Sequence, residues 1–255
     1  GVYSSQFNGA ISPQVNSSYT LLLKQNFMKL YEKRFVRTDH RVEIANGIRL
    51  WTSLEYSQRV PLRNESNVSW SKNDEREFSS NDPQDRNNFQ NSFDKHEALI
   101  LSIRFRFRIG QKYVTEPHER FIVESKFPDF HLRYKRGTKG ILGSDVNFDQ
   151  LEFSIDDKMK FGLVGTSEYA AAVGKFFNNK SMGFMDYRHF KGNRTIFLHE
   201  RFRSFNVLGY YGYSTNEWYA EAHYEHHFNG FFFNKIPGVR KLVEKIWEKF
   251  LQKFL

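Results

Sequence analysis

The segment "ALILSIRFRFRIG" at residues 98–110 is the part of the sequence from which the fold can be derived. Its period of two is typical of a β-strand with one apolar and one cationic face, because a helix would spread the arginines around its circumference. About twelve alternating residues also match the ~9–11 that a tilted strand needs to cross a bilayer. The apolar positions are Leu99, Leu101, Ile103, Phe105, Phe107 and Ile109, and the polar positions are Ser102, Arg104, Arg106 and Arg108.

Further segments show strand-like patterns, which together predict about seven or eight strands and almost no helix before residue 238. The predicted strands lie within residues 46–58, 129–135, 150–156, 160–176, 202–213 and 217–228, with a weaker candidate, "SYTLLLK", at 18–24. The connections vary in length, as the turns and loops of an outer-membrane barrel do. The predicted short connections are 37–41, 156–158 and 214–216; the longer ones are 60–97, 112–128, 136–147 and 177–203.

These patterns predict an all-β fold, an antiparallel up-and-down transmembrane β-barrel of about eight strands, complete or incomplete. Residues 1–238 form the predicted barrel region. Residues 239–255, "VRKLVEKIWEKFLQKFL", have apolar side chains at helical spacing and predict a C-terminal amphipathic α-helix. Such a helix either lies in a membrane interface or packs on protein.

Composition narrows the classes of function. The chain has 255 residues, 17% of them aromatic, and a formal net charge of +9. The mean hydropathy is −0.66, and no apolar run approaches the ~18 residues of a transmembrane helix. The basic residues are scattered, which argues against nucleic acid as a partner. The chain has no cysteine, so thiol chemistry and thiolate metal sites are excluded, and we expect no cofactor.

Alternation also assigns side chains to the two faces of the predicted wall. Polar side chains are expected in the lumen and apolar ones against lipid. The predicted lumen-facing residues are Arg49, Glu55, Arg104, Arg106, Arg108, Arg133, Lys135, Glu152, Glu168, Glu221, His223, Glu225 and His227. The predicted lipid-facing residues are Leu101, Ile103, Phe105, Phe107, Leu132, Tyr134, Phe153, Ile155, Trp218, Tyr224 and Phe228.

The arginines at 104, 106 and 108 have two interpretations. They form an anion-attracting pore lining, or they pair with inward glutamates across a narrow lumen, and pairing is favoured because half-buried ions need partners. The expected partners are Glu55, Glu152, Glu168, Glu221 and Glu225.

The histidine-rich stretch "AEAHYEHHFNG" at residues 220–230 resembles a metal or catalytic cluster only because its histidines and glutamates are close together in sequence. On a strand, His223 and His227 would lie about 13 Å apart, too far to share one ion, and His226 faces the other side. A polar ladder along the lumen is favoured, and no metal ligands or catalytic residues are assigned. A barrel hydrolase using Ser167 with a histidine such as His223 is a remote alternative.

The loop stretch "MGFMDYRHFKGN" at residues 182–193 is aromatic and basic. It is expected to anchor its loop; a lid over the barrel mouth and a contact with lipopolysaccharide are the alternatives.

Several stretches of the chain resemble a family of Bacteroidota outer-membrane proteins. In that family a carboxypeptidase-regulatory-like domain is followed by a barrel-forming domain of unknown function. The matching stretches are "YTLLLKQNFMKLYEKRFV", "NGIRLWTSLEYSQRVPL", "FRIGQKYVTEPHERFIVESKFPDFHLRYKRGTKGILGSDVNFDQLEFSIDD", "GTSEYAAAVGKFFNNKSMGFMDYRHFKGN" and "YAEAHYEHHFNGFFFNKIPGVRKL". The "HYEHHFNGFFFNKIP" block is the most distinctive. Nothing here resembles the family's N-terminal soluble domain, and beyond "NKIPGVRKL" the family continues into strands where this chain has a helical pattern.

The resemblance implies a bacterial outer-membrane location and a barrel distantly similar to the surface-antigen and outer-membrane-assembly superfamily. The expected function is therefore that of a non-enzymatic outer-membrane barrel protein with a structural, envelope-assembly or transport role. Its expected partners are outer-membrane lipid and other outer-membrane or envelope-assembly proteins. The alternative is a soluble β-rich domain that binds carbohydrate or lipid.

Overall fold

A computed structural model describes most of the chain. The described residues are 2–9, 11–64, 68–71, 77–83, 93–115, 120–123, 125–196, 202–231 and 235. The predicted C-terminal helix at 239–255 lies outside them.

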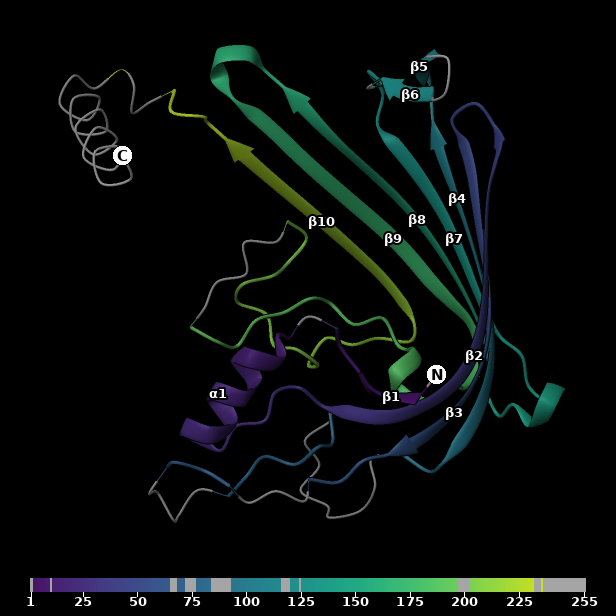
Figure 1. The fold of residues 1–255 in the computed structure, drawn as a ribbon, viewed down its shortest axis with the longest axis vertical. Helices are drawn as coiled ribbons and strands as arrows, with labels where there is room; N and C mark the ends of the chain where they lie inside the picture. The colour runs from purple at the N-terminus through teal and green to yellow at the C-terminus, as the bar shows by residue number, and fades with distance from the viewer. Residues whose placement is uncertain are drawn as a thin grey trace.

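One eight-stranded antiparallel sheet dominates the fold, and its strands follow one another up and down in chain order (Figure 1). This confirms the prediction of a mostly β, up-and-down antiparallel architecture. The strands of this sheet are β1 (Val2–Gln6), β2 (Leu30–Ala45), β3 (Ile48–Pro61), β4 (His96–Arg108), β7 (Asp129–Gly137), β8 (Asn147–Lys160), β9 (Thr166–Ser181) and β10 (Trp218–His227).

The sheet is curved and open. β1 and β10 are its edge strands, and the described strands do not close it into a barrel. β1 pairs only with the Leu30–Arg34 end of β2, so the rest of that edge is formed by β2. Figure 1 shows the sheet bending around α1 (Pro13–Leu23) and the connection between β9 and β10.

The side toward this connection is called the concave face, and the other side the convex face. The described residues of the connection, 182–196 and 202–217, are called the plug segment. It contains a 3-10 turn at Phe184–Asp186 and the bridge Arg188↔Thr215, and it lies over the end of the sheet where β1 is.

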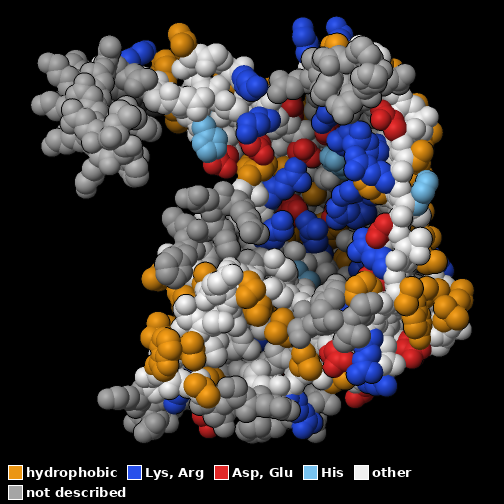
Figure 2. All heavy atoms as spheres, in the orientation of Figure 1, with side chains coloured by type: hydrophobic (Ala, Val, Ile, Leu, Met, Phe, Trp, Pro, Cys, Tyr) orange, Lys and Arg blue, Asp and Glu red, His pale blue; other side chains and the backbone are white. Residues whose placement is uncertain are grey.

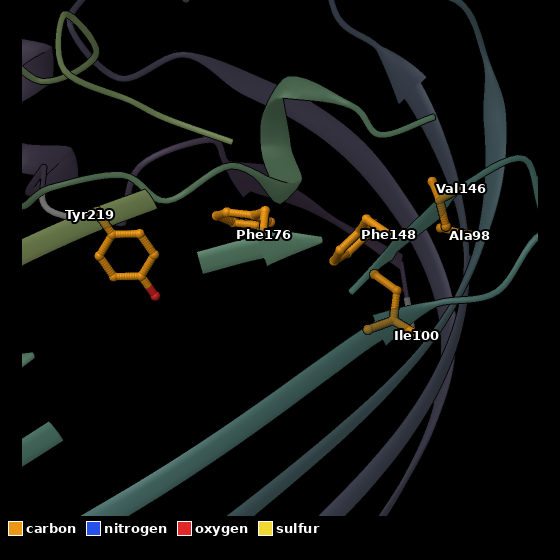
Figure 3. Packing of buried hydrophobic residues seen from close by; sticks show 6 residues of the cluster. All are labelled: Ala98, Ile100, Val146, Phe148, Phe176 and Tyr219. Atoms are coloured by element: carbon orange, nitrogen blue, oxygen red, sulfur yellow. The ribbon is translucent and has the colours of Figure 1, made fainter. Parts of the chain in front are cut away.

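A small apolar core lies between this end of the sheet and the plug segment (Figure 3). Phe148 and Ala98 have no exposed surface, and Met182 and Phe190 of the plug segment pack against the cluster. The cluster residues are Ala98, Ile100, Val146, Phe148, Phe176 and Tyr219. The core therefore fixes one end of the curved sheet, and most side chains on the rest of the concave face are polar.

The N-terminal part of the chain departs from the sequence prediction. The candidate strand at 18–24 belongs to the helix α1, which has Pro at its first turn and a left-handed Lys24 as C-cap; these are ordinary helix signals. The predicted connection at 37–41 lies inside β2, which runs unbroken. β2 is exposed along most of its length, so it lacks the apolar alternation that reveals a strand.

Other strand and turn boundaries also differ between the sequence prediction and the structure. The predicted turn at 156–158 lies inside β8, and the chain turns at the 3-10 segment Gly162–Val164 instead. β9 accordingly starts at Thr166 rather than at 160. The predicted connection at 112–128 holds a hairpin of its own, β5 (Lys112–Thr115) and β6 (Arg120–Val123).

The strand predicted at 202–213 is absent, and these residues belong to the plug segment. Their aromatic side chains are used for packing: Tyr210 is buried, and the Tyr211 hydroxyl donates to the Phe27 carbonyl at 3.1 Å. An aromatic-rich pattern here reflects a packed loop, not a sheet.

Gly174 on β9 is required by a close approach of Tyr219. A methyl group at Gly174 would lie 2.3 Å from Tyr219 Cζ, and the buried tyrosine is held by a 2.6 Å hydrogen bond to Glu152. We expect Gly174→Ala to lower the free energy of unfolding by about 1–3 kcal/mol through overpacking, measured by urea unfolding. Gly212→Ala is the control, because no heavy atom lies within 4 Å of the added carbon. Equal stability of the two variants would contradict this packing.

Candidate functional site

The concave face of the sheet is strongly charged, and Figure 2 shows Lys and Arg side chains gathered in its hollow. The strand register aligns these side chains in rows, where directly opposite Cβ atoms lie about 5 Å apart. One row runs from β2 to β10 through Arg41, Trp51, Arg104, Arg133, Glu152, Gly174 and Tyr219. The register therefore determines which charges can meet.

All thirteen side chains predicted for the lumen lie on the concave face, as the register shows. From β3 to β10 they are Arg49, Glu55, Arg104, Arg106, Arg108, Arg133, Lys135, Glu152, Glu168, Glu221, His223, Glu225 and His227. The eleven side chains predicted for lipid lie on the convex side or, for Phe228, directly after β10 with the same alternation. The strands thus separate charge from apolar surface, whereas a lumen and a lipid boundary stay predictions.

The glutamates do not pair with the arginine column as the sequence suggested. Glu55 pairs with Lys33 at 2.7 Å and Glu168 with Lys158 at 3.4 Å. The partner of Arg108 is Asp129, which lies directly opposite on β7 and accepts two hydrogen bonds of 2.6 Å. The sequence prediction was wrong about these partners because it considered only glutamates and could not see the register.

Glu152 is the carboxylate that joins the sheet to the plug segment. Its side chain is buried, and Arg133 Nη1 lies 3.1 Å from one oxygen. The other oxygen accepts the Tyr219 hydroxyl at 2.6 Å and lies 3.3 Å from Arg188 Nη1 of the plug segment. Arg188 also pairs with Glu221 on β10. One plug arginine therefore ties β8 to β10.

Asp186 makes the second junction, and it is the more deeply buried. The Arg59 guanidinium of β3 donates two hydrogen bonds to it, at 2.6 and 3.0 Å, and Lys135 Nζ of β7 lies 3.4 Å away. The exposed fractions of the Arg59 and Asp186 side chains are 3% and 1%. Burial alone would raise the pKa of Asp186, but the two cations outweigh it and hold this pKa well below its usual range.

The N-terminal region holds the plug segment from its other side. The Asn8 amide donates to the carbonyls of Phe190 at 2.9 Å and Tyr210 at 2.6 Å. On the sheet side, the Phe205 ring packs 4.5 Å from the His223 ring. The plug segment is thus fixed to the loop after β1 and to β3, β7, β8 and β10 by specific polar and aromatic contacts.

His189 is a neutral histidine inside this assembly. Its Nε2 donates to the Phe184 carbonyl at 2.9 Å, so Nδ1 accepts from the Ser214 hydroxyl at 2.6 Å. Burial lowers the pKa of His189 to about 4, with Lys135 and Arg188 opposing protonation and Asp186 favouring it.

The sequence did not reveal the charged and buried members of the plug segment. The sequence prediction treated residues 182–193 as a loop anchor and gave Asp186, Arg188 and His189 no role. The available signal was that oppositely charged Asp186 and Arg188 stand inside an aromatic run, where unpaired charge would be unfavourable.

The histidine-rich stretch is divided between the two faces. His223 and His227 lie on the concave face, and His227 pairs with Glu225 at 2.8 Å. His226 lies on the convex face, where its Nδ1 accepts a 2.7 Å hydrogen bond from Ser167. The hypothetical pairing of Ser167 with His223 is wrong, since the two side chains lie on opposite faces. Ser167 is only 3% exposed.

Within the described part of the chain, no three His, Asp or Glu side chains are grouped as a metal site would require. Nor does any described helix combine the length and apolarity needed to cross a membrane.

Comparison with known proteins gives a family. A model described as "Family of unknown function (DUF5686) C-terminal domain" matches residues 1–249, which include the whole sheet and the plug segment. No curated protein and no solved structure matches the chain.

Removing the charge of Asp186 should release the plug segment. Asp186→Asn leaves Arg59 and Lys135 buried without a counter-charge, and we expect unfolding to become easier by about 3 kcal/mol. Limited proteolysis should then cleave within residues 182–217. The control is Glu32→Gln, which breaks an exposed pair with Arg34 and should cost less than about 1 kcal/mol. A plug segment as protease-resistant as that of the unchanged chain would contradict the role of Asp186.

Acid should loosen the same region. Because the pKa of His189 is about 4 when folded and 6.5 otherwise, the unfolded chain binds the extra proton. The stability contribution is complete above pH 6.5 and is lost as the pH falls toward 4, by up to about 3 kcal/mol. Below that, protonation of Asp186 continues the loss, since its pKa is lowered from 3.8.

The measurement is the free energy of unfolding between pH 8 and pH 4. His189→Gln should flatten this profile, whereas His40→Gln, on the exposed part of β2, should leave it unchanged. A profile with the same slope in His189→Gln would show that another group is responsible.

Proposed function

We propose that this chain, which belongs to the family of unknown function (DUF5686) as its C-terminal domain, forms the wall of a β-barrel in the bacterial outer membrane. Its role is structural, in envelope assembly or in transport, and it is not catalytic. The resemblance to Bacteroidota outer-membrane proteins with a carboxypeptidase-regulatory-like domain agrees with this proposal.

The observation that carries the proposal is the large exposed apolar surface of the convex face. Side chains that a soluble protein would bury point outward from neighbouring strands, and soluble monomers rarely expose apolar patches of more than a few hundred Å². The exposed large apolar residues on this face include Val36, Leu54, Leu151, Phe153, Val173, Trp218 and Tyr224.

Strand length agrees with the same proposal. β2, β3, β4, β8 and β9 have 13 to 16 residues, more than the ~9–11 that cross a bilayer. β10 has 10 and β7 has 9. The alternative, a soluble β-rich domain, needs its apolar face packed inside, and the exposure of Val173 and Phe153 weighs against it.

The open edges set a condition on the proposal. Unpaired backbone groups are costly in hydrocarbon, so the outer edges of β2 and β10 have to be paired with further strands in a membrane. The concave face would then line the lumen. The plug segment would occupy one end of it, which favours a structural or assembly role over free diffusion of solutes.

Two valine variants test the membrane location. Val173 lies on the convex face of β9 and is 52% exposed, whereas Val207 lies in the plug segment and is 98% exposed. Lysine in contact with the bilayer core costs about 2–4 kcal/mol, so Val173→Lys should lower the yield of vesicle insertion at least about tenfold. Val207→Lys should insert like the unchanged chain.

Insertion is measured by heat-modifiable electrophoretic mobility and by protection from protease. A folded chain that stays monomeric in buffer without detergent, or a Val173→Lys variant that inserts normally, would overturn the proposal.

A further inference from the structure

Beyond the plug segment, the concave face holds arginines without carboxylate partners. Arg104 on β4 lies in a row between Trp51 on β3 and Arg133 on β7, and Arg41 on β2 lies opposite Trp51 on its other side. Among the described residues, no carboxylate lies within 4.0 Å of the Arg41 or the Arg104 guanidinium. The positive charges of Arg41 and Arg104, which lie in the same row as Arg133, therefore have no carboxylate partner among the described residues.

The nearby acids are already engaged. Asp39 accepts hydrogen bonds of 2.8 and 2.7 Å from Arg37. Glu152, the partner of Arg133, is shared with Arg188. Like charges directly opposite on neighbouring strands are unfavourable, so the pair Arg104 and Arg133 lacks a sufficient counter-charge.

The Trp51 ring contacts both guanidinium groups, and no described residue forms a hydrogen bond or an ion pair with either of them. The Arg104 guanidinium carbon lies 4.3 Å from the ring centroid and that of Arg41 lies 5.5 Å from it. Stacking on an indole holds a guanidinium in place and does not use its N–H groups. The donors are thus positioned and are not engaged by any described residue.

These side chains line a cavity of about 500 Å³. Ser53 and Ser102, which lie opposite each other on β3 and β4, add two hydroxyl groups to its wall. The charged wall residues are Arg37, Asp39, Arg41, Arg104 and Arg133, a formal excess of three positive charges. The cavity is therefore a polar, cationic hollow with room for more than a single ion.

We propose that this cavity binds a phosphate monoester group. A carboxylate offers two coplanar oxygens, whereas a phosphate offers three terminal oxygens in a tetrahedral arrangement. Donors that come from β2, β4 and β7 match three oxygens better than two, and the planar fork of arginine is suited to phosphate. The remaining volume accommodates the small polar group to which the phosphate is esterified.

The ligand is identified by this chemistry, and it has two sources: a soluble phosphate ester or the headgroup of a lipid. The proposal does not depend on membrane insertion, because every residue of the cavity belongs to this chain.

The test is titration of the full chain, folded in nonionic detergent, with inorganic phosphate and with glycerol 3-phosphate at constant ionic strength. Both should bind saturably with a Kd below about 1 mM, and Trp51 should report binding by fluorescence. Trp51→Phe should remove most of the signal. A short-chain phosphatidic acid forms the second arm: binding at least tenfold tighter than that of glycerol 3-phosphate assigns the lipid source, and equal binding assigns the soluble one.

Arg104→Gln and Arg41→Gln should each weaken phosphate binding at least tenfold. Arg108→Gln is the matched control, because it removes one charge from the same strand and face but from an arginine paired with Asp129. It should change the affinity less than about threefold.

A second readout separates binding from a structural role. Without phosphate, Arg104→Gln should melt at a higher temperature than the unchanged chain, because a like-charge neighbour of Arg133 is removed. With phosphate, only the unchanged chain and Arg108→Gln should gain stability. The absence of saturable binding up to about 10 mM phosphate, or equal losses in Arg104→Gln and Arg108→Gln, would overturn the proposal.

Discussion

Neutralisation of charge on the concave face is the constraint on which the rest of the structure depends. The strands place arginine, lysine and glutamate in rows where burial makes an unpaired ion costly. The sheet alone does not satisfy them: Arg59 and Lys135 need Asp186, and Glu152 and Glu221 receive Arg188. The plug segment therefore supplies counter-charges that the buried side chains of the sheet need.

Alternation along the strands was enough to predict the two faces of the sheet. Each of β3, β4, β7, β8 and β10 carries an apolar set on one side and a polar set on the other, and this period is visible in sequence. The same rule failed for β2, whose outer half is exposed and lacks the pattern, and for residues 202–213, whose aromatic side chains pack inside a loop. The alternating apolar pattern reflects the burial of side chains and not the strand itself. It therefore failed where a strand is exposed, as in β2, and where aromatic side chains pack inside a loop.

Only the part of the candidate site that lies on the strands could be predicted from the sequence. The inward position of Glu152 follows from its own strand, but its contact with Arg188 joins segments that alternation cannot relate. The pairing of Arg108 with Asp129 depends on the register between β4 and β7. Partners that are 127 residues apart, as Arg59 and Asp186 are, leave no local pattern in a single sequence.

The place of the plug segment in the chain also predicts an order of folding. It lies between β9 and β10, so its charged residues reach Arg59, Lys135 and Glu152 only after β3, β7 and β8 are aligned. Until then the concave face holds ions without partners, and contacts of such long sequence separation form slowly. Docking of the plug segment and addition of β10 are coupled through Arg188, which binds both β8 and β10. The last strand is thus joined to a sheet in which Arg59, Lys135 and Glu152 have just received their partners from the plug segment, and a wrongly aligned sheet would not accept it.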